Sequence, residues 1–457
     1  MSRSSEQTEA TARSLAFEIL QRVQDSGAWA SVLLERRERD LTDAREAGLL
    51  HELVLGILRR QRALDHAIDS VASRPSVEMD REVQVALRIG AYSLLYLDRV
   101  PDFAAVDSAV GLVATTRSRG SSGFVNAVLR ALARRGREAL PGAPVVGNLA
   151  SLARYHSFPD WWVGRLVDRF GWETAEALLL GSNRPAEVVL HPDLSRNTTS
   201  DLAVRLEGDG IRVEPGRLAR NALRVVGGRL ARTRAIEQGL AWVQDEAAQL
   251  VTEMFGETLG PRVADLCAAP GGKTLQMAQR LVPGGLVVAV DRHAGRMRRL
   301  KTNTLRHARG KAVLVRADAS GPHLPLRPVF QQVLVDAPCS GTGTLRRHPE
   351  IRWRLAQDDP KLLAVRQRSL LAAAAEIVAP GGSVVYSVCS MEPEEGEEVV
   401  RQFLASRPDF EVVDPRPHLS PDARPLVRDP GFLETSPIVH GVDGFFAARL
   451  KRAGDSR

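Results

Sequence analysis

Residues 262–273 read RVADLCAAPGGK, a short apolar strand followed by a turn of small residues. Glycine and alanine let backbone N–H groups approach a ligand closely before the next helix, which we expect to begin near Thr274. The turn is not a phosphate-binding P-loop, because Cys267 stands where that motif has its first glycine. The stretch therefore predicts the first strand and the ligand-binding turn of an α/β domain, and it disfavours a nucleotide triphosphatase.

Strand-like segments continue beyond this turn, separated by helical or loop sequence: LVVAVD, AVLVRAD, QQVLVDAP and GGSVVYSVCS, which end at residues 291, 318, 338 and 390. Such alternation predicts a doubly wound, mainly parallel sheet of the Rossmann-like kind. Ligands bind at the carboxyl ends of the strands in these sheets. Four acids stand at or near those ends: Asp265, Asp291, Asp318 and Asp336.

The N-terminal third of the chain has the apolar spacing of helices from residue 12 to about residue 135. The Gly- and Pro-rich stretch at 136–148 breaks that spacing and predicts a linker. Beyond it, short helices and the strand-like pieces EVVLHP and IRVEP indicate a small mixed domain. We expect three domains: an all-α domain at 1–140, an α+β connector at 148–235 and the α/β domain at 236–457.

The chain of 457 residues is basic, with a net charge of +7 and a pI of 9.7. These values favour a polyanionic partner, because neutralising phosphates releases counterions. Arginines gather around the predicted helix at 124–133, where they form either a solvated face or a grip on nucleic acid: Arg117, Arg119, Arg130, Arg134, Arg135 and Arg137. The start, MSRSSEQTEATARSL, lacks the apolar stretch of a signal peptide, and no run near ~18 apolar residues occurs, so we expect a soluble cytoplasmic protein without membrane association.

Only three cysteines occur, Cys267, Cys339 and Cys389, and no two of them form a CxxC pair. This spacing encodes neither a disulfide framework nor a zinc ribbon, and we expect no metal site. The cysteines therefore need another explanation.

The acids at the strand ends narrow the choice of cofactor. Asp291 follows Asp265 by 26 residues, the place of an acid that accepts hydrogen bonds from ribose hydroxyls, which suits both NAD and S-adenosylmethionine. The dinucleotide fingerprint GxGxxG is absent from the first turn, whereas Asp318 can accept from the exocyclic amine of adenine. The pattern therefore favours S-adenosylmethionine.

Two further segments carry a family resemblance: Asp-Ala-Pro-Cys-Ser-Gly-Thr-Gly at 336–343 and Tyr-Ser-Val-Cys-Ser at 386–390. Together with DLCAAPGGK they resemble the RNA 5-methylcytosine methyltransferases, specifically the bacterial small-subunit ribosomal RNA methyltransferase B branch. Members of that branch carry a helical RNA-binding domain like the antitermination factor NusB, which residues 11–135 resemble. The resemblance covers almost the whole chain, with further matches at VQDEAAQL, RRHPEIRW and VDGFFAARL.

The resemblance implies roles for individual residues. Cys389 is the nucleophile that adds to carbon 6 of cytosine, a step that suits a thiolate because it is nucleophilic and also a good leaving group. Cys339 assists release, and possession of both cysteines points to RNA rather than DNA. S-adenosylmethionine is bound by Asp291, Asp318, Asp336 and the turn that comprises Cys267, Ala268, Ala269, Pro270, Gly271, Gly272 and Lys273.

Asp336 could hydrogen-bond the cytosine at N3 or its amino group, and donation to N3 requires the acid to be protonated. Lys273 could approach Asp336 or promote ionisation of a thiol. The middle domain departs from the family, since Leu190-His191-Pro192 replaces the usual Arg-Val-Asn signature, which puts in doubt any contact carried over there.

Rival functions remain at this point: a methyltransferase acting on transfer RNA or DNA, or a noncatalytic RNA-binding or antitermination factor that only senses S-adenosylmethionine. Cys389, Cys339 and Asp336 argue against the noncatalytic factor. We expect small-subunit ribosomal RNA as the partner and no obligate protein partner.

Overall fold

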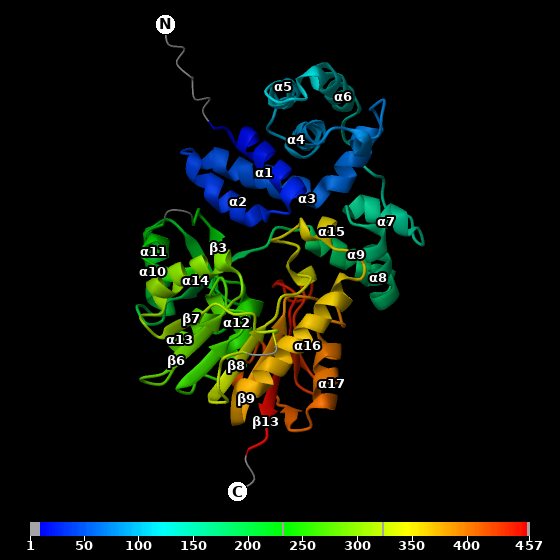
Figure 1. Ribbon diagram of the computed structural model, residues 1–457. Coiled ribbons are helices and arrows are strands. Elements are labelled where there is room, and N and C mark those ends of the chain that lie inside the picture. Colours follow the sequence, from blue (N-terminus) through cyan, green and yellow to red (C-terminus); the bar gives the residue numbers. More distant parts are fainter. Residues whose placement is uncertain (1–9, 231–232, 322–323, 455–457) are drawn as a thin grey trace. The chain divides into compact units, whose positions relative to one another are not determined.

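The computed structural model describes residues 10–230, 233–321 and 324–454 (Figure 1). Two compact units divide the chain: the first holds the residues up to Arg184 together with Leu345–Leu355, and the second holds Pro185–Thr344 together with the residues from Ala356 onward. The expected boundaries at 140 and 148 lie inside the first unit, and the boundary at 235 lies inside the second. Three separately folding domains with these bounds stay a prediction. Residues 1–9, part of the stretch judged for a signal peptide, lie outside the described residues.

The first unit is helical, as predicted. Its first helix begins after Thr11, whose side chain accepts from the backbone N–H of Ser14, and it ends at Gly27 in the left-handed region. None of the described helices combines the length and hydropathy that crossing a bilayer requires. The helices are α1 (Ala12–Ser26), α2 (Ala30–Arg37), α3 (Ala44–Asp69), α4 (Arg81–Tyr96), α5 (Asp102–Ala114), α6 (Ser122–Arg135), α7 (Leu149–His156), α8 (Asp160–Phe170), α9 (Trp172–Ser182) and α15 (Ile351–Arg354).

Hydrogen bonds explain why residues 149–184 belong to the first unit. On α3, the backbone N–H of Arg62 donates to Ser157 Oγ at 2.8 Å, and its guanidinium donates to the carbonyl oxygen of Phe158 at 2.6 Å. The fully buried Arg352 donates to Asn183 Oδ1 at 2.7 Å and lies 3.9 Å from the centroid of the Phe158 ring. The eleven residues 345–355 are therefore fastened to the helical unit, although their neighbours in sequence belong to the second.

A four-stranded antiparallel sheet opens the second unit, in the order β2-β3-β1-β4. The sequence predicted β1 (Val188–Pro192), β2 (Arg212–Pro215) and the helix α10 (Thr199–Gly208), but not β3 (Leu223–Gly227) or β4 (Ala241–Val243). β4 has only three residues, too few for a period-two pattern to be recognised, whereas β3 is as long as β1 and was missed.

The second sheet has nine strands and is mixed. Its order is β11-β12-β13-β9-β8-β5-β6-β7, with β10 also paired to β13. The five strands from β9 to β7 in this order are parallel, whereas β10 to β13 pair antiparallel at one edge. The strands are β5 (Arg262–Asp265), β6 (Leu286–Val290), β7 (Ala312–Val315), β8 (Phe330–Asp336), β9 (Val378–Val388), β10 (Phe410–Val412), β11 (Val427–Arg428), β12 (Phe432–Glu434) and β13 (Phe446–Arg452).

Helices cover both faces of this sheet. Val263, Leu334 and Val385 pack in one core with residues of α12 (Glu246–Glu253) and α13 (Gly272–Gln279). Their strand neighbours Ala264 and Val333 pack in another core with residues of α16 (Asp359–Ile377) and α17 (Glu397–Ser406), which run side by side in Figure 1. Alternate residues thus serve opposite faces, as a doubly wound sheet requires. The two remaining helices of this unit are α11 (Arg234–Glu237) and α14 (Ala294–His307).

Candidate active site

The strand order reverses at β5 and β8, which are adjacent parallel strands although β6 and β7 lie between them in sequence. Such a switch point leaves a crevice at the carboxyl ends of the strands. Asp265 ends β5 and Asp336 ends β8. The sequence correctly placed both acids at one rim, and a cavity of about 230 Å³ lies there.

The turn after β5 lines this cavity along its length, with Cys267, Ala268, Ala269, Pro270, Gly271, Gly272 and Lys273. Gly271 has φ +118°, a conformation that side chains other than glycine rarely adopt. A Cβ atom on Gly272 would stand 3.1 Å from Gln244 Oε1, tighter than ordinary contact. The turn is therefore a cradle of small residues, as the sequence predicted.

Asp265 has an unused hydrogen-bonding atom inside this cradle. Its Oδ2 accepts from Thr274 Oγ1 at 2.6 Å, while Oδ1 is buried and has no partner among the described residues. Burial, reinforced by the charge of Asp336, raises the pKa of Asp265 to about 7. An orphaned carboxylate oxygen on the wall of a cavity suits a ligand that carries an ammonium group.

Lys273 and Asp336 form an ion pair at the same place. Lys273 Nζ donates to Asp336 Oδ2 at 2.8 Å, and Ser387 Oγ donates to Oδ1 at 2.8 Å. Burial lowers the pKa of Lys273, but the charge and hydrogen bond of Asp336 outweigh it, so the net pKa is raised and the lysine stays an ammonium. Both carboxylate oxygens of Asp336 accept hydrogen bonds, and a protonated Asp336 that donates to cytosine N3 stays a prediction.

The two cysteines of the resemblance meet in space. Cys339 follows β8 and Cys389 directly follows β9, and their Sγ atoms lie 3.3 Å apart as a hydrogen-bonded pair of free thiols. The hydrogen bond to Cys389 and burial raise the pKa of Cys339 well above its usual value. Either sulfur can be the donor in this hydrogen bond, so the geometry brings the two thiols into contact without assigning the proton to one of them.

Glu395 is a residue that the sequence reasoning missed. Its carboxylate accepts from the backbone N–H of Ser340 at 2.8 Å and from Gln367 Nε2 at 3.0 Å, and the hydroxyls of Ser340 and Ser390 donate to its other oxygen. Ser340 follows Cys339, and Ser390 follows Cys389. One buried acid thus holds both cysteine-bearing segments.

Not every predicted cofactor residue reaches the cavity. Asp291 Oδ2 accepts from the backbone N–H of Ala269 at 3.3 Å, so this acid holds the backbone of the turn in place. Asp318 pairs with Arg292 and Arg366 at 3.2 and 3.3 Å, and hydrogen bonds from Ser320 hold its pKa at about 2. Neither acid is among the described residues that line the cavity, so their contacts with ribose and adenine stay predictions.

Cys267 behaves differently from the other two cysteines. It lies in the turn, and burial raises its pKa well above the usual value for a thiol. It also packs against the apolar core between the sheet and α16. A protonated, packed thiol fits the expectation of a cofactor-loop residue without redox chemistry.

Aromatic and amide side chains complete the cavity wall. Trp242, Gln244, Asn303 and His307 also line it. The His191 ring stacks on Trp242 with centroids 4.7 Å apart, and burial lowers the pKa of His191 to about 3. In this chain the departure Leu190-His191-Pro192 therefore supplies a buried, neutral support for Trp242. The family match VQDEAAQL contains Gln244, but the sequence analysis gave that residue no role in the cavity.

This doubly wound sheet, with its glycine-rich cradle, orphaned acid and strand-end cysteine pair, defines a Rossmann-like methyltransferase of the S-adenosylmethionine-dependent class. Residues 257–451 match the family described as 16S rRNA methyltransferase RsmB/F, residues 10–134 match the NusB family, and residues 158–229 match the ferredoxin-like domain of RsmF/B-like methyltransferases.

Relatives extend the match to nearly the full length. The chain is 32% identical to "Probable ribosomal RNA small subunit methyltransferase B" of Bacillus subtilis, over 97% of this chain and 99% of that protein. It is 32% identical to ribosomal RNA small subunit methyltransferase B of Pseudomonas putida, over 92% and 93% of the two chains. The solved structure of PH0851 shares the fold, with a TM-score of 0.82 at 24% identity over 97% of this chain and 99% of that chain. The chain belongs to the ribosomal RNA small subunit methyltransferase B family.

Proposed function

We propose that the protein methylates carbon 5 of a cytosine in 16S ribosomal RNA, with Cys389 as a covalent nucleophile and S-adenosylmethionine as cofactor. The observation that carries the proposal is the 3.3 Å pair of Cys339 and Cys389 beside the Lys273–Asp336 ion pair. The orphaned Oδ1 of Asp265 and the cradle at 267–273 fit the α-ammonium and methionine end of the cofactor. S-adenosylmethionine supplies the electrophilic methyl group.

Cys389 begins the reaction by adding to carbon 6 of the cytosine. The new S–C bond moves the electrons of the ring double bond toward carbon 5, which becomes nucleophilic. In this proposal Cys339 is the donor in the hydrogen bond between the two sulfurs, which stabilises negative charge on Cys389.

In this proposal Cys339 ionises more readily once Cys389 is bonded to the ring. The hydrogen bond to Cys389 and burial both raise the pKa of Cys339, and alkylation of Cys389 weakens the first of these two causes. After carbon 5 has taken the methyl group, Cys339 loses its own proton to solvent, and the resulting thiolate accepts the proton that carbon 5 still carries. The electrons of that C–H bond re-form the ring double bond, and the C–S bond breaks to return a thiolate at Cys389.

Asp336 orients and polarises the cytosine in this scheme, at N3 or at the exocyclic amine. Lys273 and Ser387 fix the position of its two oxygens. An Asp336→Asn variant keeps the shape but cannot cycle a proton at N3, so its rate of methylation should fall and the pH profile should change shape. A rate and profile equal to those of the wild type would remove Asp336 from the mechanism.

In this proposal the helical unit binds the RNA. Arg130 and Arg134 are exposed on α6 and can meet phosphates. The proposal includes a cytoplasmic location, which suits a ribosomal RNA substrate, and no obligate protein partner.

Methyl transfer by the purified protein tests the proposal. Methyl-labelled S-adenosylmethionine is incubated with small-subunit ribosomal RNA or with transfer RNA, and the RNA is digested to nucleosides. Label in 5-methylcytidine from ribosomal RNA, absent with Cys389→Ala, is the expected result. Label in transfer RNA alone supports the rival substrate, and no label with either RNA overturns an enzymatic role.

A further inference from the structure

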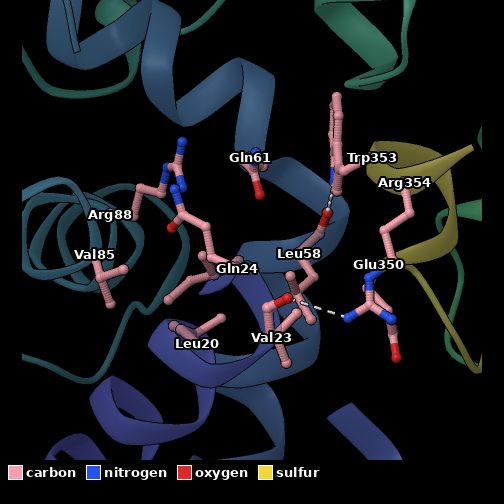
Figure 2. Close-up of a pocket in the computed structure, with 11 residues that line it drawn as sticks. Leu20, Val23, Gln24, Leu58, Gln61, Val85, Arg88, Glu350, Trp353 and Arg354 are labelled. Atoms are coloured by element: carbon pink, nitrogen blue, oxygen red, sulfur yellow. Dashed lines mark hydrogen bonds between the residues drawn. The ribbon is translucent and has the colours of Figure 1, made fainter. Parts of the chain in front are cut away.

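A second cavity, of about 170 Å³, lies within the helical unit (Figure 2). It is bounded by α1, α3 and α4 and by the segment 345–355 that is fastened to them. Leu20, Ile57 and Val85 form its apolar walls. The volume exceeds that of single waters, at about 30 Å³ each, and is below the ~300 Å³ of pockets for drug-sized ligands. It suits one planar ring.

The polar feature of this cavity is Glu350. Its side chain is almost completely buried, with 1% of the residue exposed. Oε1 accepts from the backbone N–H of Ala30 at 2.9 Å, whereas Oε2 is buried without a partner among the described residues. An unpaired buried carboxylate oxygen is costly, so it indicates a group that the site is built to receive.

Trp353 and Arg354 face the cavity from the same segment (Figure 2). Trp353 Nε1 donates to the carbonyl oxygen of Leu58 at 2.8 Å, which fixes the indole ring. The Arg354 guanidinium donates to the carbonyl oxygens of Val23 and Ala28. These contacts hold an aromatic face and a positive charge at the cavity before any ligand arrives.

Two amides stand at its more accessible side. Gln24 is exposed and Gln61 half-buried, and both line the cavity. Gln24 Nε2 donates to Gln84 Oε1 at 3.1 Å, which orients the Gln24 carbonyl. The lining of the cavity therefore combines apolar side chains, an aromatic ring, a cation, a carboxylate and amides.

We propose that this cavity receives one unstacked base of the RNA, a base with an exocyclic amine that donates to Glu350 Oε2. Proteins read single-stranded RNA by stacking splayed bases on aromatic or guanidinium planes and by hydrogen-bonding their edges. Carboxylates accept from base amines, which adenine, cytosine and guanine have and uracil lacks. The net charge of +7 favours RNA as the source of the ring. The inference rests on the proposed RNA substrate and adds a recognition site remote in sequence from the cysteines.

The test measures binding of the full-length protein to labelled pentaribonucleotides, UUAUU against UUUUU, by fluorescence anisotropy. The wild type should bind UUAUU about tenfold more tightly, the effect of one hydrogen bond to a charged group. Glu350→Gln should lose this preference, and the exposed Glu78→Gln should keep it. Gln61→Phe, which fills the cavity from its accessible side, should also lose it while leaving Glu350 intact.

Two outcomes overturn the inference: equal binding of both oligonucleotides by the wild type, or a preference that survives both Glu350→Gln and Gln61→Phe. Melting temperatures near that of the wild type exclude misfolding of either variant. Because binding is measured without methyl transfer, the result is independent of the proposed function. If the wild type prefers UUAUU but methylates no RNA, the proposed function is wrong, whereas the assignment of the cavity as a base-binding site is supported.

Discussion

Cys339 Sγ and Cys389 Sγ lie 3.3 Å apart although 50 residues separate them in sequence. Parallel pairing of β8 and β9 brings this about, because Asp336 pairs with Ser387 in the register and each cysteine follows soon after. Two thiols this close share one hydrogen bond, so only one of them can readily be the thiolate. The family resemblance, and not this distance, assigns Cys389 as the attacking sulfur and Cys339 as the assisting one.

Replacing Cys339 with alanine should trap the reaction part-way. Cys389 can still add to carbon 6, but the group that we assign to accept the carbon 5 proton is gone, so a covalent protein–RNA adduct should accumulate. Denaturing gel electrophoresis with labelled RNA detects the adduct as a retarded band. The Cys339→Ala, Cys389→Ala double variant is the control and should give none. An adduct in the double variant would show that Cys389 is not the attachment point.

Cofactor affinity should depend on pH through Asp265. Its pKa of about 7 means that the acid is mostly protonated at pH 5.5 and half ionised at pH 7, and only the carboxylate attracts an ammonium group. Affinity for S-adenosylmethionine should therefore rise on the order of tenfold from pH 5.5 to 7, below the pKa of the ligand's own amine at about 7.7–8.0. Calorimetric titration measures this without turnover. Asp265→Asn should bind the cofactor weakly at every pH in this window. If the affinity of this variant rose with pH as steeply as that of the wild type, Asp265 would be excluded as the titrating group.

Glu395 should act as a positioning residue. Glu395→Gln puts an NH₂ group against donors that include Ser340 and Ser390, so both cysteine segments should shift. Misplacement near 1 Å can cost on the order of 100-fold in rate. We expect kcat to fall by that order with little change in KM for RNA, and Glu395→Asp to recover part of it.

The exposed Glu398→Gln is the matched control for Glu395 and should leave kcat unchanged. A lower melting temperature with normal kcat in Glu395→Gln would reduce Glu395 to a purely structural role.

Charge reversal on α6 tests the RNA grip. The double variant Arg130→Glu, Arg134→Glu should weaken RNA binding and reduce the slope of log affinity against log salt by about 2, one per lost phosphate contact. Filter binding over a salt series measures the slope. A control with the same charge change in the second unit is Arg401→Glu, Arg416→Glu. Unchanged RNA affinity of the α6 variant would indicate that RNA binds at the four-stranded sheet instead.

The catalytic core was predictable because its signals are local. Strands β5 and β8 end in acids and β6 is followed directly by one, and the small residues of the turn at 267–273 can be recognised in the sequence. The cysteine pair was foreseen only through the resemblance, since no spacing rule brings together residues 50 positions apart. Parallel pairing, which does so, is a property of the whole sheet.

Other features depend on distant contacts and left no local signal. Glu395 stands in the acidic run EPEEGEE, where a glutamate usually faces solvent, and only its buried partners Ser340 and Gln367 reveal its role. Arg352 looks like a surface cation in sequence, yet it is fully buried against Phe158 and Asn183. The membership of 345–355 in the helical unit follows from such contacts.

Bisulfite sequencing of total RNA tests the central claim most directly. Cells lacking the gene are compared with cells that carry the wild type or the Cys389→Ala variant on a plasmid. We predict that one cytosine in the small-subunit ribosomal RNA loses its protection from deamination in the deletion, and that the wild type but not the variant restores it. An unchanged pattern in small-subunit RNA, or restoration by Cys389→Ala, would contradict the account.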